Sequence, residues 1–245
     1  MNKLLSAVYA AVCYAVFLIA FLYAIGFVGN LIVPRSVDAS PTSLGVGAAA
    51  LLNAALLGAF AVQHSVMARR GFKEWWTKLV PRHIERSTYV LISSLILLGI
   101  FWFWAPMKTV VWSVASPLGR EVLWGVFGFG WLVVLTSTFM IDHFDLFGLR
   151  QVYLYLNGKG PRPPEFKTHL FYGLVRHPIM SGFIIAFWAA PTMTAGHLLF
   201  AVATTGYILI GTRLEEKDLV AAIGQPYVEY QQRVSAFVPL PRGKD

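Results

Sequence analysis

The stretch that decides the fold lies at residues 178–212 and reads PIMSGFIIAFWAAPTMTAGHLLFAVATTGYILIGT. It runs for 35 residues without Asp, Glu, Lys or Arg. A single helix of that length would reach about 52 Å, whereas the hydrocarbon core of a bilayer is about 30 Å thick. Its middle, Pro191-Thr192-Met193-Thr194-Ala195-Gly196-His197, is rich in turn formers and polar groups. We therefore predict a hairpin of two short helices, at about 178–193 and 197–212.

Four more charge-free windows precede this stretch, at residues 4–34, 39–68, 87–107 and 122–141. Each window accepts one helix of roughly 20 residues, the length that crosses a bilayer. We place these spans at about 6–29, 44–66, 88–105 and 121–141. The chain of 245 residues is 57% hydrophobic and 13% charged, whereas soluble proteins carry about 25% charged residues. The sequence therefore predicts an all-α, polytopic membrane protein with about six transmembrane segments, of which four are full spans and two form the hairpin.

The basic residues lie mainly on one side of this predicted topology. The side that holds both termini carries 17 of the 20 Lys and Arg residues, and the other side carries only Arg35, Lys108 and Arg120. Because basic residues accumulate in cytoplasmic loops, both termini are expected in the cytoplasm, with a bacterial inner membrane as the expected location. The net charge of +8 then reflects orientation and contact with anionic lipids, and the sequence shows no nucleic-acid-binding motif.

Cysteine and histidine usage argues against a metal protein. Cys13 is the only cysteine, so an intrachain disulfide or a cysteine-only metal site is impossible. The six histidines include no pair four residues apart, and we expect no metal; His83, His169 and His197 are interpreted as structural. The window that holds Cys13 is too long for a signal-peptide core and is expected to be a retained span.

Polar side chains gather at the predicted cytoplasmic ends of the helices. Ionisable groups at bilayer depth cost about 2.5–3.5 kcal/mol each, so they usually face a bundle interior or a wet cavity. For any single residue, snorkelling to the interface is the alternative. The group consists of Gln63, His64, Ser65, Glu85, Arg86, Asp142, His143, Asp145, Arg176, His177, Arg213, Glu215 and Glu216.

Two of these motifs suggest a ligand with both signs of charge. Arg176-His177-Pro178 opens a helix with proline at its first position, which leaves free N–H groups beside an arginine, a suitable cradle for an anion. Glu215 and Glu216 follow at the expected C-terminus of the next helix, where the helix dipole disfavours them. Arg213 or a bound cation should compensate. S-adenosylmethionine, with its amino-acid end and sulfonium, is one molecule of this kind.

The last segment is expected to form a cytoplasmic helical cap. From Leu219 to Pro239 we predict a helix, a turn at Gly224-Gln225-Pro226, and a second helix. Tyr227, Tyr230 and Val234 share one face of it, which suits packing onto the core and a lid over a cofactor equally. Residues 157–164, NGKGPRPP, are predicted to be a loop.

The C-terminal third resembles the isoprenylcysteine carboxyl methyltransferase superfamily of membrane methyltransferases. The motifs that carry the resemblance are Tyr172, Arg176-His177-Pro178, Gly182, Arg213-x-Glu215-Glu216-x-x-Leu219, Gly224-x-x-Tyr227-x-x-Tyr230 and Val238-Pro239. Met180 departs from the tyrosine that many members have. The resemblance implies S-adenosylmethionine as cofactor, with Arg176, His177 and the helix start near its methionine end. Glu215, Glu216, Tyr227 and Tyr230 would lie around its adenosine, ribose or sulfonium, and Tyr172, Pro178, Gly182 and Arg213 complete the expected cofactor site.

The N-terminal two thirds resemble a narrower group, the methanethiol S-methyltransferases and their NnrU-like relatives. The matching stretches are 63–69 (QHSVMAR), 72–76 (FKEWW), 85–89 (ERSTY) and 141–151 (IDHFDLFGLRQ). The resemblance implies methylation of methanethiol to dimethyl sulfide, with S-adenosylhomocysteine as second product. It also implies one membrane domain over 1–245, with the substrate side in 1–150 and the cofactor side in 151–245.

A thiol must become a thiolate to accept a methyl group, and at pH 7 only a few per cent of a typical thiol is ionised. His64 is the leading candidate base, because neutral imidazole titrates in the required range. Asp142 or Asp145 would orient His64 or His143, and Arg86 would stabilise the thiolate.

Three alternatives stay open on the sequence alone. One is a membrane methyltransferase for another thiol, a prenyl-cysteine carboxylate or a lipid. The second is a sterol-type reductase that binds NADPH, and the third is a non-enzymatic NnrU-like membrane protein.

Overall fold

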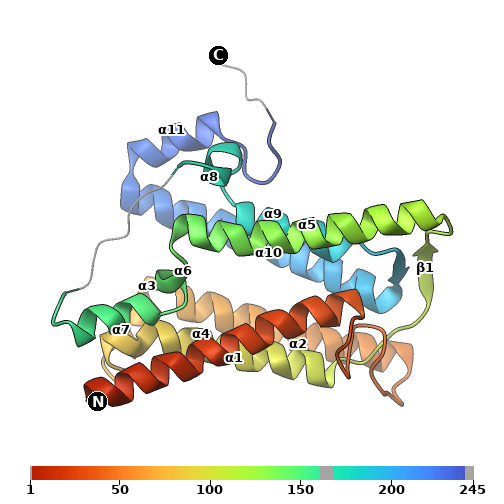
Figure 1. The fold of residues 1–245 in the computed structure, drawn as a ribbon, viewed down its shortest axis with the longest axis horizontal. Helices are drawn as coiled ribbons and strands as arrows, with labels where there is room; N and C mark the ends of the chain where they lie inside the picture. The colour runs from red at the N-terminus through yellow and green to blue at the C-terminus, as the bar shows by residue number, and fades with distance from the viewer. Residues whose placement is uncertain (1, 161–167, 241–245) are drawn as a thin grey trace. The chain divides into compact units, whose positions relative to one another are not determined.

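The computed structural model describes residues 2–160 and 168–240 (Figure 1). Within these residues the regular secondary structure is helical apart from two short strands that pair with each other. The elements, in chain order, are α1 (Lys3–Gly29), α2 (Val46–Ala68), α3 (Arg70–Trp76), α4 (Arg82–Phe103), β1 (Val110–Ser113), α5 (Pro117–Ile141), α6 (His143–Leu146), α7 (Leu149–Leu156), α8 (Phe171–Leu174), α9 (Pro178–Trp188), β2 (Thr192–Thr194), α10 (Ala195–Ile223) and α11 (Gln225–Arg233).

Five helices, α1, α2, α4, α5 and α10, are long and apolar enough to cross a membrane. This confirms a polytopic, all-α membrane protein. The predicted hairpin after residue 178 is present, with its break at β2, but its two helices are unequal. Helix α9 has 11 residues, about 16 Å, roughly half of the hydrocarbon thickness. Helix α10 has 29 residues, so the prediction that both helices would be short is wrong for α10.

Helix α10 is longer than predicted because the apolar window does not mark its end. Residues 213–223 are mostly strong helix formers, and the helix continues through them until Gly224. Gly224 has φ 76° and ψ −143°, a conformation that glycine adopts readily, so the predicted break is confirmed at Gly224, whereas Gln225 and Pro226 already belong to α11. Glu215 and Glu216 therefore lie inside α10, and the predicted separate helix from Leu219 is wrong.

The other boundaries differ by a few residues. Helix α4 begins at Arg82 rather than at residue 88, so Glu85 and Arg86 lie within it and do not precede it. Glu85 falls in the first turn, where the positive end of the helix dipole favours a carboxylate. The predicted loop at 157–164 starts directly after α7, and its residues 161–164 lie outside the described residues.

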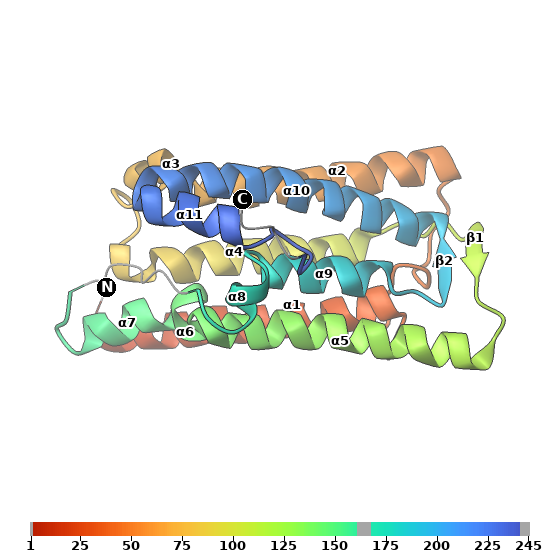
Figure 2. The ribbon, with the colours of Figure 1, turned by 90° about the horizontal axis from the view of Figure 1, so that it is seen from above.

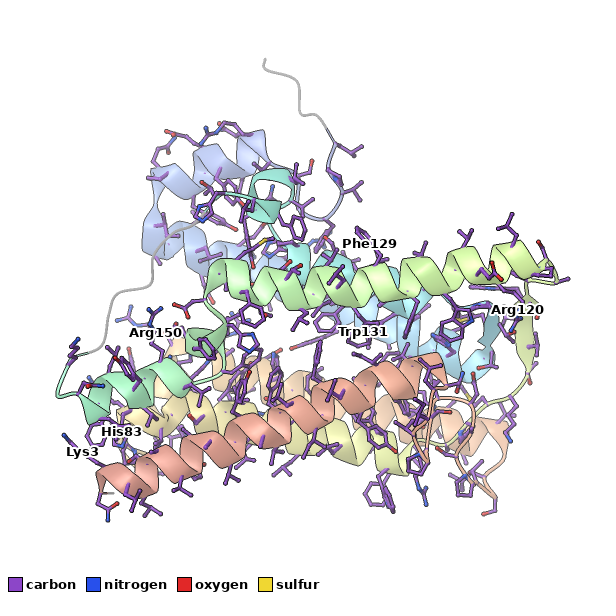
Figure 3. The ribbon with its side chains drawn as sticks, viewed as in Figure 1. Lys3, His83, Arg120, Phe129, Trp131 and Arg150 are labelled. Carbon is purple, nitrogen blue, oxygen red and sulfur yellow. The ribbon has the colours of Figure 1, made fainter. Side chains whose placement is uncertain are left out.

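The chain divides into two compact units. Unit 1 covers the described residues of 1–109, 142–164 and 194–197. In it α4 packs against α1 and α2, and α7 packs against α1 (Figures 1 and 2). Figure 3 shows Lys3 and His83 at one end of this unit. The Lys3 Nζ donates to the Leu156 carbonyl at 2.8 Å, and the His83 ring stacks on Tyr155 with centroids 3.7 Å apart. These contacts attach α7 to the starts of α1 and α4.

Unit 2 covers the described residues of 110–141, 165–193 and 198–245. Its core is the close crossing of α5 and α9 (Figure 2). Two glycines face each other there: a Cβ on Gly182 would lie 2.7 Å from the Gly130 carbonyl oxygen, and one on Gly130 would lie 2.8 Å from the Gly182 carbonyl oxygen. Trp131 packs beside them, 5.8 Å from the Phe183 ring, whereas Phe129 leaves α5 in another direction and is exposed (Figure 3).

Gly182→Ala should destabilise unit 2, because the added methyl group meets backbone atoms that cannot move without separating α5 from α9. Overpacking of this kind costs about 1–3 kcal/mol. Thermal unfolding of the purified protein in detergent should show a clearly lower midpoint. Gly128→Ala is the matched control, since a Cβ there has nothing within 4 Å. Equal midpoints for both variants would contradict the close crossing.

Candidate functional site

The Glu216 carboxylate is the centre of a buried polar network in unit 2. Its Oε1 accepts from the Arg176 Nε at 2.7 Å and lies 3.0 Å from the His177 Nε2. Its Oε2 accepts from the Gln231 side-chain amide at 3.0 Å. The Arg176 side chain is 6% exposed and that of Glu216 is 17% exposed. Both carboxylate oxygens are thus satisfied, and three segments of the chain meet on one side chain.

Arg176 also holds the end of the described chain in place. Its guanidinium donates to the backbone carbonyls of Gln231 and Val234. The backbone N–H groups of Arg176 and His177 donate to the carbonyls of Ser235 and Ala236, at 2.9 and 3.0 Å. The segment after α11 therefore lies against the start of α9. The predicted use of Arg176 as an open anion cradle differs from this geometry, because its guanidinium already binds Glu216 and two carbonyls.

Glu215 lies at the edge of this network. Its Oε2 is 3.8 Å from the His177 Nδ1, and its side chain is 54% exposed. Arg213 is exposed, and the cation that pairs with Glu216 is Arg176. The expectation that Arg213 or a ligand neutralises Glu216 is therefore corrected. Because Glu215 carries an accessible carboxylate, it is the group of this cluster that can meet a positively charged ligand.

Three tyrosines pack beside the network. Tyr172, Tyr227 and Tyr230 are 7%, 2% and 4% exposed. The Tyr230 hydroxyl donates to the Tyr172 carbonyl at 2.5 Å, and the rings of Tyr227 and Tyr230 meet edge to face. Burial raises the pKa of all three hydroxyls, and that of Tyr230 to about 12 although Arg176 opposes the rise. The three therefore stay protonated at physiological pH.

Two other predicted cofactor residues shape the start of α9. Pro178 occupies its first turn, as predicted, and is fully buried. Since proline has no N–H and His177 uses its own, the first-turn donors left for a ligand are those of Ile179 and Met180. Gly182 lies one turn further on, at the crossing with α5.

A second polar cluster lies in unit 1 around His64, between α2 and α4. The His64 Nδ1 is 3.2 Å from the Ser93 Oγ, and the Tyr89 hydroxyl lies 3.0 Å from Nδ1 and 2.9 Å from Nε2. Ser93 donates to the Gln63 side-chain oxygen at 3.3 Å. The Phe60 ring stacks on the imidazole with centroids 5.0 Å apart. The imidazole is thus held on both nitrogens inside two candidate membrane spans.

Arg86 and His143 lie on other contacts of unit 1. The Arg86 guanidinium lies over the Tyr89 ring, 5.0 Å from its centroid, and its Nε donates to the Leu146 carbonyl at 2.7 Å. His143 is 4% exposed, and its Nε2 is 2.7 Å from the Tyr14 hydroxyl. Burial lowers the pKa of His143, so this imidazole is neutral at pH 7.

The two predicted aspartates have structural partners. Asp142 accepts from the Asp145 N–H as the N-cap of α6 and pairs with Arg150. The Asp145 side chain accepts from Gln151 at 3.2 Å. Arg86 thus contacts Tyr89, which in turn contacts His64. Asp142 lies just before α6 and Asp145 lies within it. Among the described residues, no group of three His, Cys, Asp or Glu side chains could hold a metal ion.

Sequence reasoning missed several members of both clusters. Gln231 binds Glu216 through an uncharged side-chain amide, and Tyr89 and Ser93 lie in a mostly apolar helix and were not expected to contact His64. One usable signal was present: Tyr89 and Ser93 are four residues apart on α4 and so share a face.

Proteins named methanethiol S-methyltransferase match this chain over nearly its whole length. That of Mycobacterium tuberculosis is 56% identical over 98% of this chain and 98% of the relative. Methanethiol S-methyltransferase 2 of Bradyrhizobium diazoefficiens is 53% identical, with 97% and 91% covered. The protein of Crocosphaera subtropica is 49% identical, with 95% and 91% covered.

No protein-family model matches this chain, and no solved structure does. Identities near one half over almost full length, together with five helices suited to crossing a membrane, agree with the resemblance inferred from the motifs. The chain therefore belongs to the methanethiol S-methyltransferase family of integral membrane proteins.

Proposed function

We propose that this protein transfers a methyl group from S-adenosylmethionine to methanethiol, producing dimethyl sulfide and S-adenosylhomocysteine. The observation that carries the proposal is the full-length similarity to three proteins that bear the methanethiol S-methyltransferase name. The two polar clusters supply chemistry that suits it. Residues 1–150 would provide the thiol side and residues 151–245 the cofactor side.

The donor set in unit 2 fits the amino-acid end of S-adenosylmethionine. The exposed Glu215 carboxylate suits the ammonium group, and the free first-turn N–H groups of α9 suit the carboxylate. Arg176 would act by holding Glu216 and His177 in place, and Tyr172, Tyr227 and Tyr230 by supporting that network. Pro178, Gly182 and Arg213 remain proposed members of the site. The cofactor would supply a methyl group activated by its sulfonium.

We propose the Nε2 of His64 as its basic nitrogen, on the basis of the hydrogen bonds around the ring. The Ser93 hydroxyl hydrogen goes to Gln63, so the Ser93 oxygen accepts from the His64 Nδ1–H. The Nε2 then carries the lone pair and accepts from the Tyr89 O–H at 2.9 Å. In this proposal the imidazole is neutral and its Nε2 is hydrogen-bonded to the Tyr89 hydroxyl.

This arrangement supports a proton relay. The thiol S–H bond breaks as its proton passes to the Tyr89 oxygen, while the Tyr89 proton passes to the His64 Nε2. The products are a thiolate and an imidazolium whose Nδ1–H still donates to Ser93. Arg86, whose guanidinium lies over the Tyr89 ring, would stabilise the thiolate by its positive charge. His143, Asp142 and Asp145 are proposed to support the same side of the reaction.

We also propose that both termini lie in the cytoplasm and that the protein resides in a bacterial inner membrane. The support is the distribution of Lys and Arg, 17 of 20 on the side of the termini. A cysteine introduced at Thr42 tests this orientation, because residue 42 would then face the outside of the inner membrane. A membrane-impermeant maleimide should label it on intact cells, and a lack of labelling would argue against the orientation.

Membranes that contain this protein should form dimethyl sulfide from methanethiol and methyl-deuterated S-adenosylmethionine. The product should carry one deuterated methyl group, since the donor's methyl is transferred intact. Headspace gas chromatography with mass detection measures it, and membranes from cells without the gene are the control. Absence of the product from membranes with folded protein would refute the proposed activity.

Glu215→Gln and Glu216→Gln should separate ligand contact from network support. Glu215 is exposed, so its variant should keep the wild-type melting midpoint and raise the KM for the donor about tenfold, a loss of one charge-assisted hydrogen bond. Glu216→Gln leaves Arg176 without its anion and should lower both the melting midpoint and the turnover. The exposed Glu229 provides the control variant, Glu229→Gln. An unchanged KM in Glu215→Gln would remove Glu215 from the proposed donor site.

Tyr89→Phe should lower kcat about a hundredfold, the usual contribution of general acid–base catalysis, with little change in the KM for methanethiol. Tyr9→Phe is the matched control, because the Tyr9 hydroxyl makes a similar bond, 3.0 Å to Thr88 on α4. Steady-state rates across pH 6–9 measure the effect. A kcat for Tyr89→Phe equal to that of Tyr9→Phe would eliminate the relay.

A further inference from the structure

A hollow of about 540 Å³ lies in unit 1 where three candidate membrane spans end. Its lining comes from the segment between α1 and α2, the first residues of α2, and the last residues of α4 with the segment that follows. These three helix ends lie together in Figure 1. Because helices suited to crossing a membrane end there, the hollow lies at the depth of the lipid headgroups rather than in bulk water.

Buried hydrogen bonds hold the walls of the hollow. Asn53, which is fully buried, donates to the Ala105 carbonyl at 2.8 Å and accepts from the Ala105 N–H at 2.9 Å. The Trp104 indole donates to the Val37 carbonyl at 3.2 Å, and the Tyr23 hydroxyl donates to the Arg35 carbonyl at 3.1 Å. The hollow is therefore a preformed feature of unit 1, as most ligand sites are.

The hollow contains one cation in a fixed position. The Arg35 guanidinium lies over the Trp102 ring, 4.4 Å from its centroid, and donates one N–H to the Trp102 carbonyl at 2.9 Å. A guanidinium has five N–H groups, and among the described residues this is its one hydrogen bond. The nearby acid, Asp38, is engaged by Asn30 and Thr194. Arg35 therefore has directed donors left for an anion.

The rest of the lining combines hydroxyl groups with apolar walls. Thr42 and Ser43 are exposed; the Thr42 Oγ1 accepts from the Leu44 N–H and so keeps its hydrogen for a ligand. Leu44 and Phe103, 44% and 62% exposed, line the hollow beside them. One cation and two hydroxyls next to exposed apolar side chains match a phosphodiester joined to acyl chains.

We propose that this hollow binds a membrane phospholipid. Its phosphodiester accepts from Arg35, Thr42 and Ser43, and its acyl chain lies along Leu44 and Phe103. Guanidinium groups bind phosphate oxygens strongly because the hydrogen bonds are charge-assisted and directional. The site is independent of the proposed methyl transfer, since none of its residues belongs to either polar cluster.

Native mass spectrometry of the detergent-purified full chain tests the proposal with three matched probes. Dioleoylphosphatidylglycerol has both the phosphate and the chains, dioleoylglycerol lacks the phosphate, and glycerol 3-phosphate lacks the chains. The first phosphatidylglycerol adduct should form about tenfold more weakly in Arg35→Gln, and should be weakened also in the loop variant Thr42→Val/Ser43→Ala. Dioleoylglycerol should not distinguish the variants from the wild type.

Arg120→Gln is the control for the loss of one arginine near the end of a membrane span. Arg120 donates to the Val114 carbonyl at 3.5 Å near the start of α5 and does not line the hollow. Its variant should bind phosphatidylglycerol as the wild type does. Equal affinity in Arg35→Gln, or binding of glycerol 3-phosphate as strong as that of the lipid, would overturn the proposal.

Discussion

The Glu216 carboxylate is the group on which the described end of unit 2 depends. A charge on a helix with apolar surroundings is costly unless it is paired and hydrogen-bonded. Arg176, His177 and Gln231 supply those partners, and each comes from a different part of the chain from Glu216 itself. The ion pair therefore does more than neutralise charge. It also helps to position α11 and the segment after it, because the guanidinium that Glu216 holds donates to their carbonyls as well.

The fold class was predictable because its cause is local. A charge-free window of 20 or more residues has few alternatives to a membrane span, and the spans at α1, α2, α4 and α5 follow from such windows. The length of α10 was not predictable in this way. The window ends at Thr212, but the helix ends where Gly224 takes a conformation that interrupts it. The charged residues after Thr212 predict the end of a helix, whereas α10 continues through them and Glu216 pairs with Arg176 from a distant segment.

The candidate site was predictable by residue type and less so by partner. Arg176, His177, Glu215 and Glu216 lie near one another, as expected for polar groups on one membrane face, although the two glutamates are inside α10 and not at its end. The hydrogen bonds from Arg176 to Glu216 and to backbone carbonyls could not be predicted. Every residue has a backbone carbonyl, so the sequence does not indicate which ones accept a hydrogen bond. The same holds for His64. Its hydrogen-bond partners are Tyr89 and Ser93 on another helix. The sequence had instead predicted that Asp142 or Asp145 would orient His64 or His143.

Both polar clusters follow one physical rule, which also accounts for the hollow at Arg35. In each, close contacts fix a charged or basic group: Glu216 beside the exposed Glu215, His64 against the Tyr89 hydroxyl, and Arg35 above Trp102. In a chain with few charges, such arrangements cost free energy and persist where another group completes them. A charged cofactor, a small thiol and a lipid phosphate are the partners that we propose for these three places, in that order.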